Sequence, residues 1–552
     1  SVGAARRTGT ALINEDVAFP RERLADAVRD LQLLLAAHRF DDAVVFGHAR
    51  DGNMHFAFSL DSDGSSIERY GQFMERLAEL VVERYDGSLK AEHSTGRNMA
   101  PFLEHQWGGR VVDLMRHVKQ LLDPEGLLNP DVIFTQDRRI HLHNIKQLPP
   151  VSSHVDRCIE CGFCERVCPS SELTLSPRQR IIVQREIVRH SRDCIARRLE
   201  RDYVYAGMET CATDGLCMVT CPVGINSGDL TIAQRSQSKR MLERVYWQIA
   251  ASRVRGWIRG IGIALSVARG ASNVLGERVV HCTTERLARL FRIPSWLPAM
   301  GIPEHFSVTS LPEADVLYVP SCMACFGGRS PHGHSIVSSL LRIAERAGIS
   351  VAVTRTAGTV CCGHPWHSYG YEHQYRHVLD QWVEAVFCES DGGRVPIVID
   401  SSSCQLSLRV AREHSGKTGQ MLAALRILGP VEFAELIVER LGIVGQSVSL
   451  IVHPACSLRR LDGGVESLVQ VLQRSRCTVE LPHSAWCCGM AGDRGLRYPE
   501  LPAHALDVAI KEIAALDADM VVSTNLPCQW QLSHRIGKPV ISLWEALDLL
   551  YQ

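Results

Sequence analysis

Seven cysteines and one aspartate of this sequence have the types and spacing of ligands for iron–sulfur clusters. The first half of the motif reads Cys158-x2-Cys161-x2-Cys164-x3-Cys168 and is followed directly by Pro169. Two-residue gaps let three thiolates surround one cubane, while the fourth cysteine, set apart by a longer gap, can reach a second cluster. This spacing predicts a [4Fe–4S] centre.

The same frame recurs downstream with Asp214 at the middle ligand position, which completes the two-cluster spacing of bacterial ferredoxins. Because the fourth cysteine of each half binds the other cluster, two ligand sets are predicted. They are Cys158, Cys161, Cys164 and Cys221 for cluster one, and Cys168, Cys211, Asp214 and Cys217 for cluster two. A carboxylate binds iron more weakly than a thiolate, so cluster two is expected to be either an Asp-ligated [4Fe–4S] or a [3Fe–4S] cluster. A zinc ribbon also uses Cys-x2-Cys pairs, but both halves end in Cys-Pro, which favours iron.

Residues 311–552 contain two copies of a second cysteine pattern. In each copy a strand-like apolar run leads to a cysteine, a Cys-Cys-Gly triplet follows, and a later run leads to Cys-Gln. Strands that alternate with helical stretches predict two α/β domains with parallel sheets, and the cysteines then lie at the carboxyl ends of the strands. The candidate ligands are Cys322, Cys325, Cys361, Cys362 and Cys404 in the first copy, and Cys456, Cys487, Cys488 and Cys528 in the second.

These two copies resemble the cysteine-rich, or CCG, domains of heterodisulfide reductases and of glycolate and lactate oxidase iron–sulfur subunits. The resemblance implies either a non-cubane [4Fe–4S] cluster or zinc, with the first copy, which has the extra Cys325, as the better cluster site. The family's fullest pattern ends in Cys-x-x-Cys, and this chain departs from it at Cys404 and Cys528. A redox disulfide or inert thiols are the alternative.

The cysteine-free start of the chain contains a second group of candidate metal ligands. His48 and His55 stand on either side of a tight Asp-Gly turn, and Glu92 and His93 are adjacent. Imidazole and carboxylate donors suit zinc, manganese or iron. Amphipathic helices at 20–38, 66–85 and 101–122 and a strand at 43–46 predict an α+β domain.

These segments resemble the C-terminal, substrate-side domain of FAD-linked oxidases, the family that includes D-lactate and D-2-hydroxyglutarate dehydrogenases. The resemblance implies that His48, His55 and Glu92 hold a divalent metal that grips a small 2-hydroxy acid. It implies that His93 is the catalytic base, which takes the hydroxyl proton as hydride leaves for flavin. Arg6 or Arg7 is a candidate for pairing with the substrate carboxylate.

The order of the parts resembles the rear half of large bacterial FAD/iron–sulfur D-2-hydroxyacid dehydrogenases. The expected fold is an α+β substrate-domain remnant, an α-helical dicluster ferredoxin module and two α/β CCG domains. The expected boundaries are 1–136, 150–231, a helical connector over 232–310, 311–430 and 431–552. About 150 residues precede the ferredoxin motif, too few for an FAD domain as well, so FAD is expected from a missing segment or a partner flavoprotein.

The composition limits the classes of partner that we expect for this protein. The chain of 552 residues has 60 Lys and Arg against 61 Asp and Glu, which argues against a nucleic-acid partner. No apolar run is long enough for a membrane span, although the basic connector suggests either a helix on the inner face of the cell membrane or a packing helix. Clustered cysteines without a signal peptide predict a cytoplasmic protein.

The sequence therefore predicts the iron–sulfur part of a flavin-dependent dehydrogenase that oxidises a D-2-hydroxy acid. Electrons would pass from FAD through the clusters to a quinone or cytochrome. The alternative is a non-catalytic electron-transfer subunit of a heterodisulfide-reductase or glycolate-oxidase type of complex. A zinc-rich interaction protein is a third interpretation.

Overall fold

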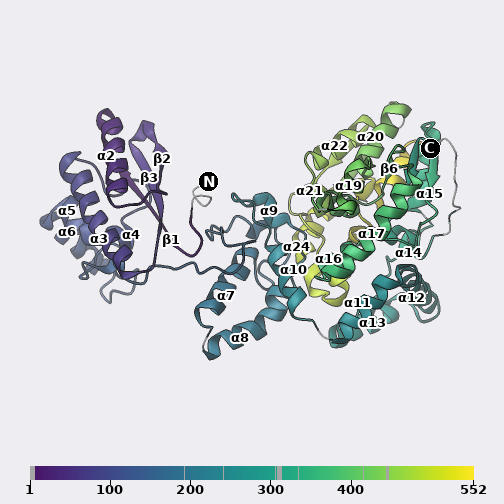
Figure 1. The fold of residues 1–552 in the computed structure, drawn as a ribbon, viewed down its shortest axis with the longest axis horizontal. Coiled ribbons are helices and arrows are strands. Elements are labelled where there is room, and N and C mark those ends of the chain that lie inside the picture. The colour runs from purple at the N-terminus through teal and green to yellow at the C-terminus, as the bar shows by residue number, and fades with distance from the viewer. Residues whose placement is uncertain are drawn as a thin grey trace. The chain divides into compact units, whose positions relative to one another are not determined.

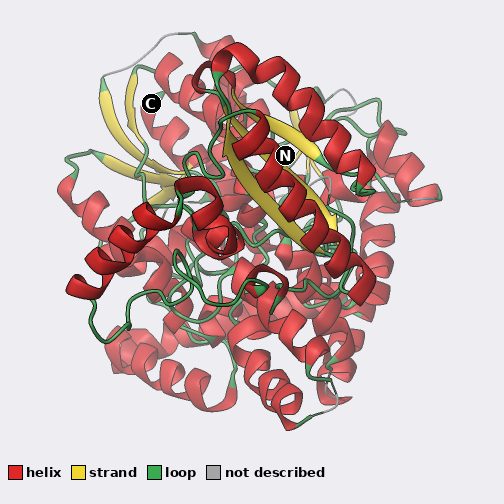
Figure 2. Cartoon of the chain, turned by 90° about the vertical axis from the view of Figure 1, so that its left-hand side faces the viewer, coloured by secondary structure: helices red, strands yellow, loops and turns green. Residues whose placement is uncertain are grey.

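The computed structural model describes residues 6–191, 193–239, 241–304, 306, 314–333, 335–414, 416–442 and 447–552. The chain divides into two compact units. Unit 1 comprises Ser1–Cys161 and Ile181–Arg197, and unit 2 comprises Gly162–Arg180 and Arg198–Gln552. Helices dominate, and the described strands form one three-stranded and two four-stranded sheets (Figure 2). The predicted boundary between residues 310 and 311 lies outside the described residues.

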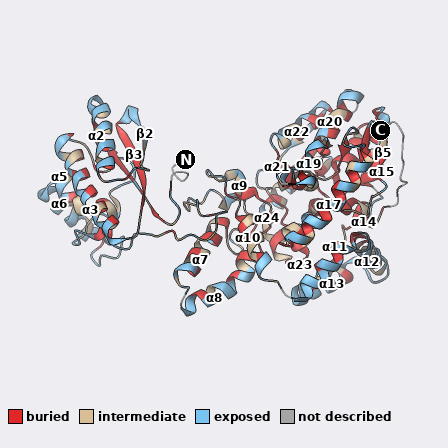
Figure 3. Cartoon of the chain, in the orientation of Figure 1, coloured by how far each residue is buried: buried red, intermediate tan, exposed pale blue. Residues whose placement is uncertain are grey.

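The first part of unit 1 is an antiparallel sheet covered by helices (Figure 1). The strand order is β1-β3-β2, and the central strand β3 is buried along its whole length (Figure 3). The elements are β1 (Ala11–Ala18), α2 (Leu24–Ala37), β2 (Val44–His48), β3 (Asn53–Leu60), α3 (Gly64–Ala78), α4 (Gly96–Met99), α5 (Leu103–Trp107) and α6 (Gly109–Leu122). This is the α+β arrangement that the sequence predicted.

Local chemistry explains where these helices begin and end. Asp63 caps α3, because its carboxylate accepts a hydrogen bond from the Ser66 N–H at 2.9 Å. The buried face of α3 then presents Tyr70 and Phe73 to the sheet. The sequence predicted one helix over 101–122, but the helix breaks at Gly108, whose φ of +73° only glycine adopts easily.

The cysteine motif between the domains is mostly helical, as predicted. Its elements are α7 (Pro177–Arg189), α8 (Cys194–Tyr203), α9 (Leu216–Thr220) and α10 (Ser227–Gln237). Cys217 lies in α9, whereas the other six cysteines of the motif lie in the connecting loops or in short turns. Three further helices follow, α11 (Met241–Ser252), α12 (Val254–Leu275) and α13 (Glu277–Phe291).

The last part of unit 2 confirms the predicted pair of α/β repeats. Two parallel sheets have the strand orders β5-β4-β6-β7 and β9-β8-β10-β11, so both follow the order 2-1-3-4 within their repeat. The strands are β4 (Val316–Tyr318), β5 (Val351–Val353), β6 (Ile397–Val398), β7 (Ile427–Leu428), β8 (Val448–His453), β9 (Cys477–Glu480), β10 (Met520–Ser523) and β11 (Val540–Ser542). Identical topology shows that the repeated cysteine pattern reflects a repeated fold.

Helices pack around these strands in matching places. In the first repeat they are α14 (Cys322–Gly327), α15 (Ile336–Arg346), α16 (His364–Ser368), α17 (Glu372–Glu389), α18 (Ser402–Ala411), α19 (Lys417–Ala424) and α20 (Pro430–Leu441). In the second they are α21 (Cys456–Arg459), α22 (Gly464–Arg474), α23 (Arg494–Arg497), α24 (Glu500–Ala515), α25 (Leu526–Ile536) and α26 (Leu543–Leu550). Among the described helices, none has the length and apolarity of a membrane span.

Candidate functional site

The sheet of unit 1 brings the predicted histidines together. His55 lies on the central strand β3, where it pairs with Asp16 of β1 on one side and Phe46 of β2 on the other. His48 ends β2, and the two imidazole rings lie 5.6 Å apart between their centres. His55 is buried, whereas the side chain of His48 is 60% exposed, so the group opens toward solvent.

Glu92 and His93 complete the group. Glu92 Oε1 lies 2.9 Å from His55 Nε2, 3.8 Å from His48 Nε2 and 3.4 Å from His93 Nε2. The rings of His55 and His93 are stacked with their centres 4.9 Å apart. The four residues singled out from the sequence as metal ligands and base are therefore neighbours.

A buried carboxylate that the sequence analysis missed positions this loop. Asp16 Oδ2 accepts hydrogen bonds from the N–H groups of Ala91, Glu92 and His93, at 3.1, 2.6 and 3.2 Å. Its other oxygen lies 3.9 Å from His93 Nδ1. Burial alone would raise the pKa of Asp16, but the N–H donors and the charge of Lys90 hold it below its ordinary value. A charged residue in the middle of a buried strand is a signal that could have revealed it.

The donor set suits a divalent metal. In each of two groups, three ligand atoms lie within 4.8 Å of one another. The groups are His48–His55–Glu92 and Asp16–His55–His93. His55 Nδ1 and Asp16 Oδ1 are buried without a hydrogen-bond partner, which is costly unless another group satisfies them. Two imidazoles and a carboxylate with an open side match a catalytic rather than a closed structural site.

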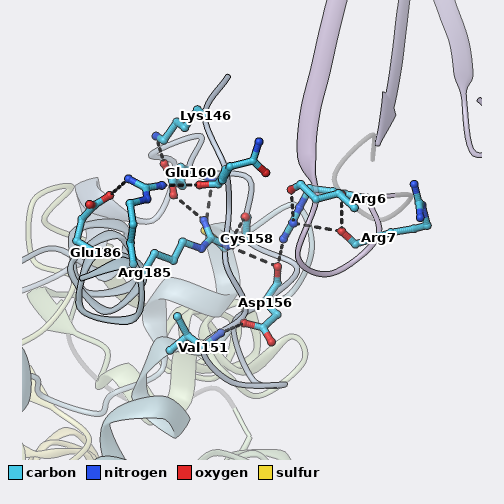
Figure 4. A network of polar contacts seen from close by, with 12 residues as sticks. Arg6, Arg7, Lys146, Val151, Asp156, Cys158, Glu160, Arg185 and Glu186 are labelled. Atoms are coloured by element: carbon cyan, nitrogen blue, oxygen red, sulfur yellow. Dashed lines mark hydrogen bonds and ion pairs between the residues drawn. The ribbon is translucent and has the colours of Figure 1, made fainter. Parts of the chain in front are cut away.

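Arg6 and Arg7 are not brought to this group, and Figure 4 shows Arg6 beside Asp156 instead. Arg6 is buried and donates to the Asp156 carbonyl and, at 3.2 Å, to the Thr10 carbonyl. Arg7 pairs with Asp61 at 2.9 Å. Both precede β1 at the end opposite Asp16 and His55, because Ala11 pairs with Leu60 and Asp16 with His55. Their predicted contact with a substrate carboxylate is therefore not supported, and their guanidinium groups serve the fold instead.

A polar network holds the first cysteine loop in unit 1 (Figure 4). The buried Arg185 donates to the Cys158 carbonyl at 2.9 Å and to Glu160 at 2.6 Å. Glu160 also pairs with Lys146, and Asp156 accepts the Val151 N–H at 2.7 Å. These contacts fix the backbone around Cys158 before any cluster binds.

The backbone shows that the two halves of the motif share one frame. Positive φ occurs two and four residues after the first cysteine in each half, at Glu160 and Gly162 and again at Thr213 and Gly215. Asp214 therefore occupies the backbone position that Cys161 has in the first half. The last cysteines also match, since Cys168 and Cys221 are both extended, as residues before proline prefer.

Two buried arginines face the thiols of the motif in unit 2. Arg180 Nη1 lies 3.8 Å from Cys168 Sγ, and Arg235 donates to the Cys211 carbonyl at 2.7 Å. Burial raises the pKa of Cys211, but both guanidinium groups lower it to below its ordinary value. Buried positive charge beside thiols fits ligands that bind as thiolates. Neither arginine was predicted, because each reaches its cysteine through the fold.

All the cysteines of the repeat pattern lie beyond the carboxyl ends of parallel strands, as predicted. In the first repeat, Cys361 Sγ lies 3.7 Å from Cys322 Sγ, and Cys362 Sγ lies 3.5 Å from Cys404 Sγ. In the second, Cys488 and Cys528 have their sulfurs 3.0 Å apart. No disulfide joins any described cysteine, which leaves the thiols available to metal.

Family comparisons agree with the division of the chain into a histidine-bearing domain, a cysteine motif and α/β repeats. A model of the C-terminal domain of FAD-linked oxidases matches residues 1–133, a 4Fe-4S dicluster domain matches 154–225, and a cysteine-rich domain matches 450–533. The chain therefore contains an FAD-oxidase C-terminal domain, an iron–sulfur dicluster domain and a CCG domain in its second repeat.

Individual relatives match different shares of the chain. The glycolate oxidase iron–sulfur subunit of Escherichia coli is 24% identical over 416 residues, 70% of this chain and 91% of the relative. The glycolate oxidase subunit GlcD of Bacillus subtilis is 31% identical over 141 residues, 25% of this chain and 29% of the relative. A D-2-hydroxyglutarate dehydrogenase of Haemophilus influenzae is 29% identical over 209 residues, which is 32% of this chain and 19% of the relative. The chain thus spans less than a third of the length of GlcD and of this D-2-hydroxyglutarate dehydrogenase.

Proposed function

We infer that this chain is the substrate-side and iron–sulfur part of a flavin-dependent dehydrogenase that oxidises a small D-2-hydroxy acid to the 2-oxo acid. The observation that carries the proposal is the convergence of His48, His55, Glu92 and His93 on one open group within an FAD-oxidase C-terminal domain. The relatives named for glycolate and D-2-hydroxyglutarate oxidation support the substrate class.

Each residue of the group has a defined task. His48, His55 and Glu92 would hold a divalent metal, with zinc, manganese or iron suited to the donors. When bound, a metal there would lower the pKa of a substrate hydroxyl, and a flavin would supply the acceptor for the hydride. His93 takes the hydroxyl proton, and the nearby Asp16 carboxylate stabilises the resulting imidazolium. The loop bonds to Asp16 keep both Glu92 and His93 in place.

Electrons leave through the cysteine-rich parts. We assign two clusters to the seven cysteines of the ferredoxin motif, and a further cluster or zinc to each CCG repeat, with a quinone or cytochrome as the acceptor. The buried Arg180 and Arg235 favour an anionic cluster beside Cys168 and Cys211, since opposite charge stabilises the thiolates. No residue of this chain is assigned to FAD, which we propose comes from another segment or a partner flavoprotein.

The outer face of α11–α13 supports peripheral binding to a membrane, where a quinone would be available. Leu242, Val274 and Leu290 are exposed by 83%, 83% and 72%. Residues 241–293 contain nine arginines, three glutamates and no lysine or aspartate. Apolar side chains with surplus arginine suit an anionic lipid surface. The inner face of the same helices packs on the first repeat through Trp247 and Ile258.

A non-catalytic electron-transfer subunit remains the second candidate, because the iron–sulfur relative covers most of this chain. One experiment separates the two functions. The protein is purified anaerobically with its flavoprotein segment or partner, and reduction of the clusters by D-2-hydroxy acids is followed in wild type and His93→Ala. We expect the variant to retain its iron but to lose substrate-driven reduction. Unchanged reduction would exclude His93 as the base, and absence of iron in wild type would overturn the whole proposal.

A further inference from the structure

The segment that carries Asp214 packs directly on the second α/β repeat. Leu216 and Val167 form a small buried cluster with Cys487, and Cys456 and Trp486 pack against it. At Gly215, a Cβ atom would lie 2.6 Å from the guanidinium carbon of Arg460. The loop backbone therefore lies directly against the side chain of Arg460, which follows Cys456 by four residues.

The Asp214 carboxylate has one oxygen without a hydrogen bond. Oδ1 accepts the Leu216 N–H at 3.1 Å, whereas Oδ2 is buried and has no hydrogen-bond partner. A buried carboxylate oxygen without a donor is costly, so it requires a cation or a proton.

The second repeat is one ligand short of the first. In the first repeat Cys325 follows Cys322 by one helical turn, and it gives that repeat five candidate thiols. The equivalent position after Cys456 is Arg459, which leaves four. The segment that carries Asp214 packs on Cys487 and Cys456 through Leu216. The missing fifth ligand is therefore available from the ferredoxin module.

The spacing of the sulfurs indicates more than one metal ion. Among the described residues, two groups of three ligand atoms lie within 4.8 Å of one another, and neither group contains a cysteine. One zinc ion bound by four thiolates would hold their sulfurs about 3.8 Å apart, which follows from a Zn–S distance of about 2.3 Å. The wider spread suits a cluster of several irons, whose ligands bind different metal atoms.

We propose that Asp214 Oδ2 is a ligand of an iron–sulfur cluster in the second repeat, rather than of the ferredoxin cluster that its sequence position indicates. This inference rests on the proposed iron–sulfur function. The thiolate ligands of the repeat cluster are then Cys456, Cys487, Cys488 and Cys528. Ferredoxin cluster two retains three thiolates, Cys168, Cys211 and Cys217, and is a [3Fe–4S] cluster. The Asp214 carboxylate then belongs to the repeat cluster, while Cys211 and Cys217 on either side of it in the sequence bind ferredoxin cluster two.

The test compares Asp214→Asn with one cysteine variant from each site. Asn keeps the shape of the side chain but removes its charge, and Asp202→Asn, at an exposed carboxylate of α8, is the matched control. Iron and acid-labile sulfide per chain and the paramagnetic resonance spectra of both redox states are measured on the anaerobically purified whole protein. Cys487→Ser defines the effect of disrupting the repeat cluster, and Cys217→Ser that of disrupting ferredoxin cluster two.

We expect Asp214→Asn to change the same resonance lines as Cys487→Ser and to leave the ferredoxin lines at full intensity. A spectrum that matches Cys217→Ser would assign Asp214 to the ferredoxin cluster and overturn the inference. An unchanged spectrum and iron content, or a Cys487→Ser variant identical to wild type, would also overturn it. These outcomes leave the proposed function standing, whereas wild-type protein without iron would refute the function itself.

Discussion

Substitution of Asp16 by Asn is the sharpest test of how the histidine group is positioned. Asp16 is fully buried and its Oδ2 accepts three backbone N–H bonds from residues 91–93. Hydrogen bonds to a charged group are worth about 1 kcal/mol more than neutral ones, so three such bonds amount to about 3 kcal/mol. At about 1.4 kcal/mol per tenfold change, the loop should open about 100-fold more often.

Amide hydrogen exchange of residues 91–93 measures that opening directly. In Asp16→Asn, we expect exchange of these amides to accelerate by about two orders of magnitude, and the metal affinity of the group to fall with it. Asp26→Asn, at an exposed position on α2, should leave both unchanged. Equal protection of the loop in Asp16→Asn and wild type would show that the carboxylate does not hold it.

The pH dependence of the same loop has a defined sign. The folded-state pKa of Asp16 lies below its ordinary value of 3.8, so its stabilising effect is complete at neutral pH. The effect is lost as the pH falls below 3.8 and through the folded-state pKa. Loop protection in wild type should therefore be constant from pH 5 to pH 7 and fall only in stronger acid, whereas Asp16→Asn should lack this acid transition.

Three further substitutions test other parts of the molecule. His55→Ala should weaken the affinity of the protein for zinc or manganese by more than about 100-fold, as measured by metal titration. A variant that binds metal as tightly as wild type would contradict the assignment. Arg180→Gln removes a buried positive charge beside Cys168, so it should lower the reduction potential of that cluster; an unchanged or higher potential in a redox titration would refute the electrostatic argument. Leu242→Glu with Val274→Glu should abolish co-sedimentation with anionic phosphatidylglycerol vesicles but not alter the iron content, and equal binding of wild type to neutral vesicles would exclude an electrostatic contribution.

The ferredoxin motif and the repeats could be predicted because their information is local. Ligands three residues apart must approach one cluster, and the positive φ angles at Glu160 and Thr213 show the same turn in both halves. The repeated strands could be recognised from short apolar runs followed by cysteine. The matched strand order confirms them, because a parallel α/β unit has few ways to fold.

The histidine group was predictable only in part. Adjacent residues such as Glu92 and His93 belong together in any fold, and His48 and His55 share a hairpin. Asp16 reaches the group from a strand far away in sequence, through the pairing of β1 with β3. The same pairing puts Arg6 and Arg7 at the other end of the sheet, which residue type alone could not show.

The sequence by itself determined which residues carry ligand chemistry and how the chain divides into an oxidase domain, a dicluster motif and two α/β repeats. Short spacings fix these features, since neighbours along the chain stay neighbours in space. Only the tertiary structure decided which distant groups meet: Arg180 at the Cys168 thiol, Arg235 at the Cys211 carbonyl, Asp16 at the loop of residues 91–93, and the segment of Asp214 against Cys487. Burial and charge act through those contacts, and packing creates them regardless of separation in sequence.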